Sequence, residues 1–182
     1  MTRFKDLTRA QLTDAQRRVY NAIASGPRGG VQGPFKVLLA SPELADRVQH
    51  LGEFARYRTS LPPRLSELAI LITARFWDAE FEWNAHVPEA IDGGLAPAVI
   101  AAVAQRVRPD FENDDEAVLY DFCAELLERH RASDQRFADA VACFGEAGVV
   151  ELVGVLGYYS LLALVMNAFE VPPAAPAEPP LA

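Results

Sequence analysis

The sequence contains little cysteine and little histidine. Cys123 and Cys143 lie far apart, with neither a CxxC pair nor the spacing of metal ligands. The three histidines, His50, His86 and His130, do not form an HExxH motif. These absences argue against a zinc site and against disulfide exchange at a CxxC motif. Two separated cysteines of this kind are typical of reduced thiols in a cytoplasmic protein. We therefore expect a cytoplasmic location and no metal or cofactor.

Basic residues are also scarce. Lys and Arg number 17 against 25 Asp and Glu, which gives a net charge of −8. We therefore expect no binding to nucleic acid or to an acidic membrane, because both need a basic face. A small anionic ligand is not excluded, provided that arginines gather locally. The N-terminal MTRFKDLTRAQ has no apolar run after its basic residues, so it does not predict a secretory signal.

A phosphate-binding loop is missing as well. The stretch SGPRGGVQGP at 25–34 is rich in glycine, but it lacks the Lys-Ser/Thr pair and a preceding strand. We interpret it as a connector that could fold as a flap over a site.

Strand signals are absent along the whole chain. No segment keeps an alternating apolar and polar pattern, and no NG or DG turn separates β-branched runs. The fold is therefore predicted to be all-α. The length fits one domain over 1–170, and the Pro- and Ala-rich 171–182 is predicted to be a disordered tail.

Periodicity and capping residues locate the expected helices. The N-terminal signals are Ser41 with Pro42, Ser66, Asp78 and Ser133. Pro88 lies inside one segment and predicts a kink or an early end there. The predicted helices cover 11–24, 41–57, 67–77, 78–91, 95–107, 113–131, a segment from 133 onward, and 149–169.

The last predicted helix contains the uncharged run LVGVLGYYSLLALVMNAF, which is close to the minimum length of a membrane span. No basic cluster flanks the run and no second span accompanies it, so we favour a buried helix. Gly154, Gly157 and Ser160 would let another helix approach closely. The same surface predicts oligomerisation.

Three ionisable residues stand in the otherwise apolar segment ELAILITARFWDAEFEWNAH at 67–86. Glu67 precedes a run that is apolar on nearly every face, and Glu82 and His86 share a helix face at i and i+4. Such glutamates often interact only with the helix dipole, and such pairs often lie on the surface. The alternative is a secluded pocket in which carboxylates orient the imidazole for proton transfer.

The segment RLSELAILITARFWDAEFEWNAHVPEAIDGGLAPAVIAAV resembles the core helix pair of the carboxymuconolactone decarboxylase family, within the AhpD-like (alkylhydroperoxidase-type) superfamily. The matching features are Glu67, the aliphatic run, the Phe81-Glu82-Trp83 patch, His86, and GGL before a short apolar helix. The resemblance covers about 60–105. It implies an AhpD-like helical bundle that forms oligomers, as trimers or hexamers.

The peroxidase branch of this superfamily carries a CxxC motif before the histidine. Counted back from His86, the two cysteine positions are Ala79 and Glu82, so both thiols are missing. Peroxide reduction needs a thiolate, which neither residue supplies. The resemblance therefore implies the decarboxylase-like branch, whose members place a Glu four residues before the His.

That branch implies a cofactor-free reaction in which the conjugated lactone of the substrate accepts electrons as CO2 leaves. On this pattern His86 is the acid, Glu82 its orienting partner, and Glu67 a second relay or base. An arginine would bind a substrate carboxylate, and aromatic side chains would wall the pocket. The candidate substrate-binding residues are Arg75, Trp83, Phe81 and Tyr57, with Arg56, Arg58 and Trp77 as further candidates.

The sequence leaves three functions open. The first is a decarboxylase or lactone-processing enzyme that acts on a small carboxylated substrate of the kind met in aromatic catabolism. The second is a non-catalytic oligomeric protein of the same fold. The third, an alkylhydroperoxidase- or peroxiredoxin-type antioxidant using Cys123 and Cys143, ranks last because the CxxC motif is absent.

Overall fold

The computed structural model describes residues 3–173 and 181. All regular structure in this part of the chain is helical, which confirms the all-α prediction. The predicted disordered tail falls mostly on 174–180 and 182, which lie outside the described residues. The elements are η1 (Arg9–Gln11), α1 (Asp14–Ser25), α2 (Pro34–Leu38), α3 (Pro42–Tyr57), α4 (Pro63–Phe76), α5 (Glu80–Asp92), α6 (Pro97–Ala104), α7 (Asp114–Arg129) and α8 (Asp134–Phe169).

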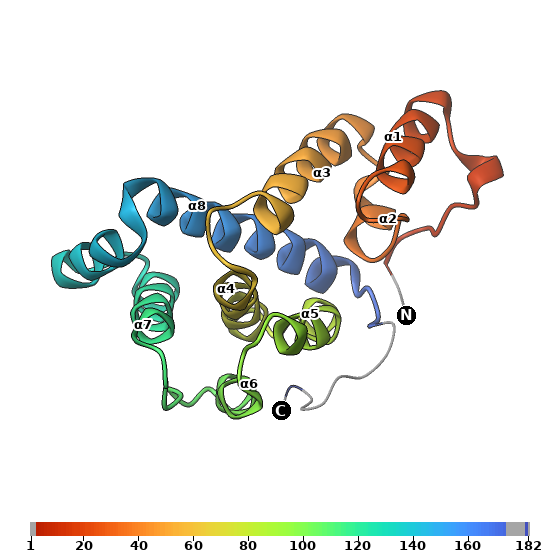
Figure 1. Ribbon diagram of the computed structural model, residues 1–182. Coiled ribbons are helices and arrows are strands. Elements are labelled where there is room, and N and C mark those ends of the chain that lie inside the picture. The colour runs from red at the N-terminus through yellow and green to blue at the C-terminus, as the bar shows by residue number, and fades with distance from the viewer. Residues whose placement is uncertain (1–2, 174–180, 182) are drawn as a thin grey trace.

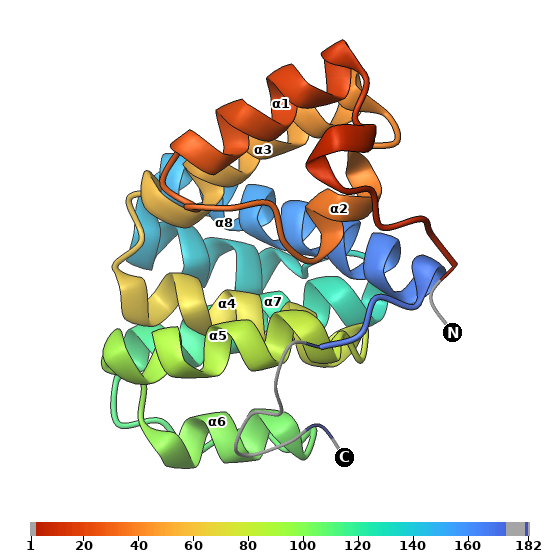
Figure 2. The same cartoon turned by 90° about the vertical axis from the view of Figure 1, so that its right-hand side faces the viewer.

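Helix α8 runs through the middle of the molecule (Figure 1). Helices α1, α2 and α3 cover one side of it, and α4, α5 and α7 lie on the other, with α6 beyond them (Figure 2). Helix α4 contacts α5, α6, α7 and α8, so it is the centre of its layer. Because α2 and α3 also pack on α8, residues early in the chain meet residues near its end.

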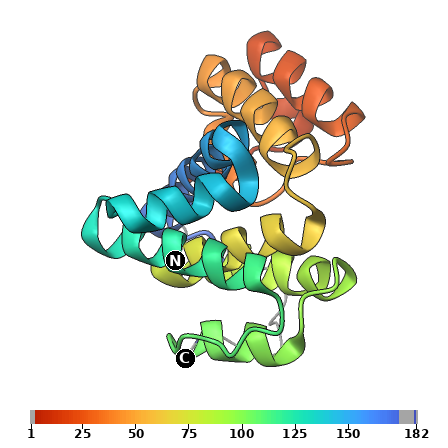
Figure 3. The ribbon, with the colours of Figure 1, turned by 60° about the vertical axis from the view of Figure 1, so that its left-hand side comes forward.

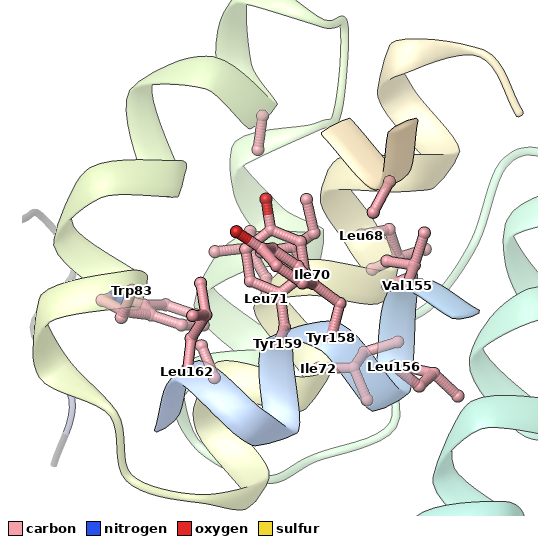
Figure 4. Packing of buried hydrophobic residues seen from close by; sticks show 14 of the residues in the cluster. Leu68, Ile70, Leu71, Ile72, Trp83, Val155, Leu156, Tyr158, Tyr159 and Leu162 are labelled. Atoms are coloured by element: carbon pink, nitrogen blue, oxygen red, sulfur yellow. The ribbon is translucent and has the colours of Figure 1, made fainter. Parts of the chain in front are cut away.

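The core is centred on α4, which packs against α5, α7 and α8. Every residue from 65 to 75 is buried, which explains why this part of the sequence is apolar on all faces. Burying each large aliphatic side chain contributes roughly 1.5–3 kcal/mol. Figure 4 shows side chains from α4, α5 and α8 interleaved in this region. The labelled residues are Leu68, Ile70, Leu71, Ile72, Trp83, Val155, Leu156, Tyr158, Tyr159 and Leu162.

Two of the predicted helix starts are wrong. Helix α4 begins at Pro63, because a proline is favoured in the first turn, where its missing N–H is not needed. Ser66 lies inside this helix and donates its hydroxyl to the Pro63 carbonyl at 3.1 Å. Asp78 does not cap α5. It has a left-handed φ of 49° and its carboxylate pairs with Arg106 at 2.8 Å.

Other local predictions agree with the structure. Helix α3 follows Ser41 with Pro42 in its first turn, and the Ser133 hydroxyl accepts a hydrogen bond from the Arg136 N–H at 3.4 Å. Helix α5 continues past Pro88 to Asp92, so the early end that we considered there does not occur.

Helix α8 joins the last two predicted helices into one bent element. Its backbone leaves the helical region at Gly145, where φ is 72° and ψ is 166°. Glycine tolerates this left-handed region because it has no Cβ. The bend separates a short arm from the long central arm (Figure 3). Within the described residues, α8 is also the one helix long and apolar enough to cross a membrane, and half of its most apolar window is buried.

Candidate active site

Glu67, Glu82 and His86 converge at the contact between α4 and α5. The Nδ1 atom of His86 lies 2.7 Å from Oε2 of Glu67, and its Nε2 atom lies 3.6 Å from Oε2 of Glu82. The exposed fractions of Glu67, Glu82 and His86 are 7%, 4% and 2%. The imidazole therefore stands between two buried carboxyl groups, and the surface-pair interpretation does not apply.

The turn between α4 and α5 creates this arrangement. The Ala79 N–H donates to the Ala74 carbonyl at 2.8 Å, and Arg75 and Arg106 both pair with the Asp78 carboxylate. The chain reverses in a few residues, so that α5 lies beside α4 (Figure 2). A residue near the start of α4 is thereby brought opposite the middle of α5, where His86 lies.

A cavity of about 160 Å³ adjoins the imidazole. It is formed by the glycine-rich loop (residues 26–33) with the start of α2, and by parts of α3, α5 and α8. Its lining residues are Arg28, Gly30, Gln32, Pro34, Phe35, Arg56, Phe81, Glu82, Ala85, His86, Tyr159 and Leu162. Two arginines and the buried Glu82–His86 pair thus share one small space.

Glu67 borders a different hollow. This second hollow measures about 550 Å³, and its lining includes Tyr57, Ser66 and Glu89. Arg56 lines both spaces and donates a hydrogen bond to Glu89 at 3.2 Å. The hydrogen bond between His86 Nδ1 and Glu67 Oε2 therefore links the small cavity with the larger hollow.

Burial sets the protonation of the groups around the imidazole. Desolvation raises the pKa of Glu82, against a lowering by the charges of His86, Arg28 and Arg56. The Tyr159 ring meets the His86 ring edge-on at a centroid distance of 5.0 Å, and burial raises the Tyr159 pKa well above its usual value. Tyr159 therefore keeps its proton and forms an uncharged wall, while Glu82 favours its neutral form more than an exposed glutamate does.

The structure brings some of the predicted substrate-binding residues to the site and not others. Phe81 lines the small cavity, and Tyr57, which is 46% exposed, lines the larger hollow. Trp83 is fully buried in the core and lines neither space (Figure 4). Arg75 donates its Nε–H to the Ala104 carbonyl at 2.7 Å and lines a separate depression. The prediction that Trp83 and Arg75 line the cavity beside His86 is therefore corrected, because Trp83 lies in the core and Arg75 faces another depression.

Of the three further substrate-binding candidates, Arg56, Arg58 and Trp77, one lies at the site and two lie elsewhere. Arg56 lies at the site, between the two spaces. Arg58 pairs with Glu53 at 2.6 Å on the surface, and Trp77 donates its indole N–H to the Ser160 hydroxyl at 3.0 Å.

Sequence reasoning missed Arg28. Its guanidinium donates to the Tyr158 hydroxyl at 2.6 Å and lies over the Phe35 ring at 4.5 Å from the centroid. The available signal was an arginine inside a glycine-rich connector, where no helix surface accounts for its charge. The sequence predicts that 25–34 is a connector that could fold as a flap, but it assigns no role to Arg28.

The thiols lie elsewhere. Cys123 is buried in α7, where desolvation raises the pKa of its thiol, and Cys143 is exposed in the short arm of α8. Neither lines the cavity beside His86. Among residues 3–173 and 181, no group of three His, Cys, Asp or Glu side chains could hold a metal ion.

Residues 42–117 match the model of the Carboxymuconolactone decarboxylase family. This range contains α3 to α6 and therefore Glu67, Glu82 and His86. No curated protein matches the sequence.

Three solved structures show the same fold. An uncharacterized peroxidase-related protein from Ralstonia eutropha JMP134, described as an alkylhydroperoxidase AhpD core, is 16% identical with a TM-score of 0.77, over 94% of this chain and 92% of its own. An uncharacterized peroxidase-related protein from Silicibacter sp. TM1040 is 16% identical with a TM-score of 0.75, over 96% and 92%. A cysteine-to-alanine variant of the debrominase Bmp8, in complex with 2,3,4-tribromopyrrole, is 14% identical with a TM-score of 0.74, over 96% and 95%.

At 14–16% identity, the three structural similarities establish an AhpD-like fold and no more. The family match over 42–117 confirms the resemblance seen in the sequence. Residues 42–117, somewhat less than half of the chain, are similar to the carboxymuconolactone decarboxylase family.

Proposed function

We propose that the protein is a cofactor-free enzyme that transfers a proton to a small carboxylated substrate, as a decarboxylase or lactone-processing enzyme. One observation carries the proposal. A buried imidazole stands between two carboxyl groups at 2.7 Å and 3.6 Å, beside a small cavity that two arginines also line. Burial raises the pKa of Glu82, and a buried carboxyl group with a shifted pKa in a cavity is common in sites of acid–base catalysis.

Each group has a role in such a reaction. When the bond to the departing CO2 breaks, its electron pair passes into the conjugated lactone and forms a dienolate. The His86–Glu82 pair supplies the proton that completes the new C–H bond, and Glu67 holds Nδ1 and stabilises the imidazolium. Arg28 and Arg56 oppose the negative charge that develops on the substrate oxygen.

The buried carboxyl group at position 82 supports this proposal over an antioxidant one. Thiol-based reduction of peroxide needs a cysteine beside the histidine, and the side chains there are Ala79 and Glu82, both buried. The structural neighbours described as peroxidase-related or as a debrominase are only 14–16% identical to this chain, so their activities do not transfer to it.

The test is a screen of small lactone acids and β-keto acids for release of CO2 or ring opening. We expect His86→Ala to lower turnover by roughly 10²- to 10⁴-fold, the usual contribution of a general acid. His50→Ala is the matched control, because that side chain is 66% exposed and lies on α3. Turnover that survives in His86→Ala would refute the assigned acid, and failure of every such acid with the wild type would leave the non-catalytic alternative.

A further inference from the structure

We infer that Arg28, carried by the glycine-rich loop, is the residue that binds the carboxylate of the ligand. The inference deepens the proposed function and rests on it for the identity of the substrate. Arg28 lines the same 160 Å³ cavity as Glu82 and His86, although it lies far from them in the sequence.

Neighbouring side chains hold the Arg28 guanidinium in one place. Its Nη2 donates to the Tyr158 hydroxyl at 2.6 Å, and its planar group lies over the Phe35 ring. Gly52 of α3 backs this pair, because a Cβ there would lie 2.5 Å from Arg28 Nη2 and closer still to the Tyr158 oxygen. A side chain at position 52 would therefore displace the guanidinium.

The charge of Arg28 is not neutralised by the protein. Within residues 3–173 and 181, no carboxylate forms an ion pair with it, whereas Arg56 pairs with Glu89 and Arg58 with Glu53. Within the described residues, Tyr158 accepts a hydrogen bond from one of the five N–H donors of Arg28. A guanidinium with free donors binds a carboxylate through two parallel hydrogen bonds, which a lysine could not do.

The cavity limits the rest of the ligand. Its volume of about 160 Å³ is close to the roughly 150 Å³ that holds a benzene molecule in an engineered cavity. Phe35, Phe81 and Tyr159 supply flat apolar surfaces around it. The ligand class is therefore a carboxylate on one ring or on a short planar chain, with its carboxylate at Arg28 and its body toward His86.

Isothermal titration calorimetry with benzoate, and with uncharged benzamide as its isostere, tests the inference without any turnover. We expect the wild type to bind benzoate and to bind benzamide at least tenfold more weakly. Arg28→Met keeps the aliphatic stem and removes the charge, so benzoate binding should weaken roughly 10- to 100-fold while benzamide binding stays unchanged. Arg58→Met is the control and should bind benzoate like the wild type, because Arg58 is exposed and outside the cavity.

Several results would overturn the inference. They are a wild type that does not bind benzoate, equal affinities for benzoate and benzamide, and an Arg28→Met variant with wild-type affinity. Tyr158→Phe gives a second variant in case Arg28→Met does not fold, as judged by its circular dichroism melt. It frees the guanidinium from its hydroxyl partner and should weaken benzoate binding severalfold, and unchanged binding would count against the inference.

The inference and the proposed function can fail separately. Benzoate binding that depends on Arg28, together with no turnover of any acid, would retain the inference and reject the enzyme. Turnover that depends on His86 but is unchanged in Arg28→Met would retain the proposed enzyme and reject the role of Arg28.

Discussion

The carboxyl group of Glu82 is buried beside an imidazole and two arginines, and its pKa is raised because desolvation outweighs these positive neighbours. An ionised Glu82 would neutralise Arg28 and repel an incoming carboxylate. A neutral Glu82 leaves Arg28 available. Ligand binding and the protonation of this one side chain are therefore coupled, and binding of a carboxylate should weaken as the pH rises through the pKa of Glu82.

Replacing Glu82 with glutamine tests the same residue through stability. The folded pKa lies above the ordinary value of 4.5, so below pH 4.5 the group is protonated in both the folded and the unfolded protein and carries no penalty. As the pH rises from 4.5 towards the folded pKa, the unfolded protein ionises while the buried group keeps its proton, so the free energy of unfolding falls by about 1.4 kcal/mol for each unit of the shift and then stays at that lower level. We expect Glu82→Gln to melt above the wild type at neutral pH, and the two curves to converge at low pH.

Thermal melts across this pH range provide the measurement. Glu43→Gln is the control, because Glu43 is exposed in the first turn of α3 and pairs with exposed Arg47. A Glu82→Gln variant that is less stable than the wild type at neutral pH would contradict the raised pKa.

At the scale of elements, Gly52 couples α3 to the glycine-rich loop and to α8. Glycine inside a helix usually costs about 1 kcal/mol relative to alanine, so Gly→Ala should stabilise an open helix. Gly52→Ala should do the opposite, because its Cβ meets Tyr158 and Arg28. We expect a lower melting temperature and weaker benzoate binding in this variant.

Gly157→Ala on α8 is the matched control for that prediction. Among the described residues, no side chain or other helix comes within 4 Å of the Cβ position there, so the substitution should raise stability by about 1 kcal/mol and leave benzoate binding unchanged. Equal effects of the two substitutions would show that helix propensity alone accounts for Gly52.

The helices themselves were largely readable from the sequence, since the 3.6-residue periodicity and the prolines mark them. Helix α2 was missed because five residues are too short to show a period. The trio of Glu67, Glu82 and His86 was predictable because i,i+4 spacing and the family pattern bring those residues together. Arg28 was not, because its position depends on a contact with Tyr158 that only tertiary packing creates.

At the scale of the whole molecule, an apolar strip stays uncovered along α3 and α8. Its members Leu51, Phe54, Val150 and Val153 are 46%, 41%, 71% and 44% exposed. Most of them line a hollow of about 600 Å³ together with Gly154. Contiguous exposed apolar residues often mark a protein interface, so we place the interface of the predicted homo-oligomer at this strip.

Val150→Glu tests that expectation. A charge at the most exposed position of the strip should dissociate the assembly, and the sedimentation coefficient in analytical ultracentrifugation should fall to that of a monomer. Val107→Glu is the control, since it is 54% exposed between α6 and α7 and away from the strip. A wild type that already sediments as a monomer would refute the predicted homo-oligomer.

The contact between Glu67 and His86 joins two hollows, and a ligand of the class inferred above, bound in the smaller one, would leave the larger one open. Glu67 then still borders the larger hollow, so the imidazole can exchange its hydrogen with bulk water during occupancy. The hydrogen delivered to the substrate would accordingly originate in the solvent. If the complex is formed in ordinary water and diluted into heavy water, even one turnover of bound substrate should yield a product with a single deuterium at the newly formed bond, detectable by mass spectrometry.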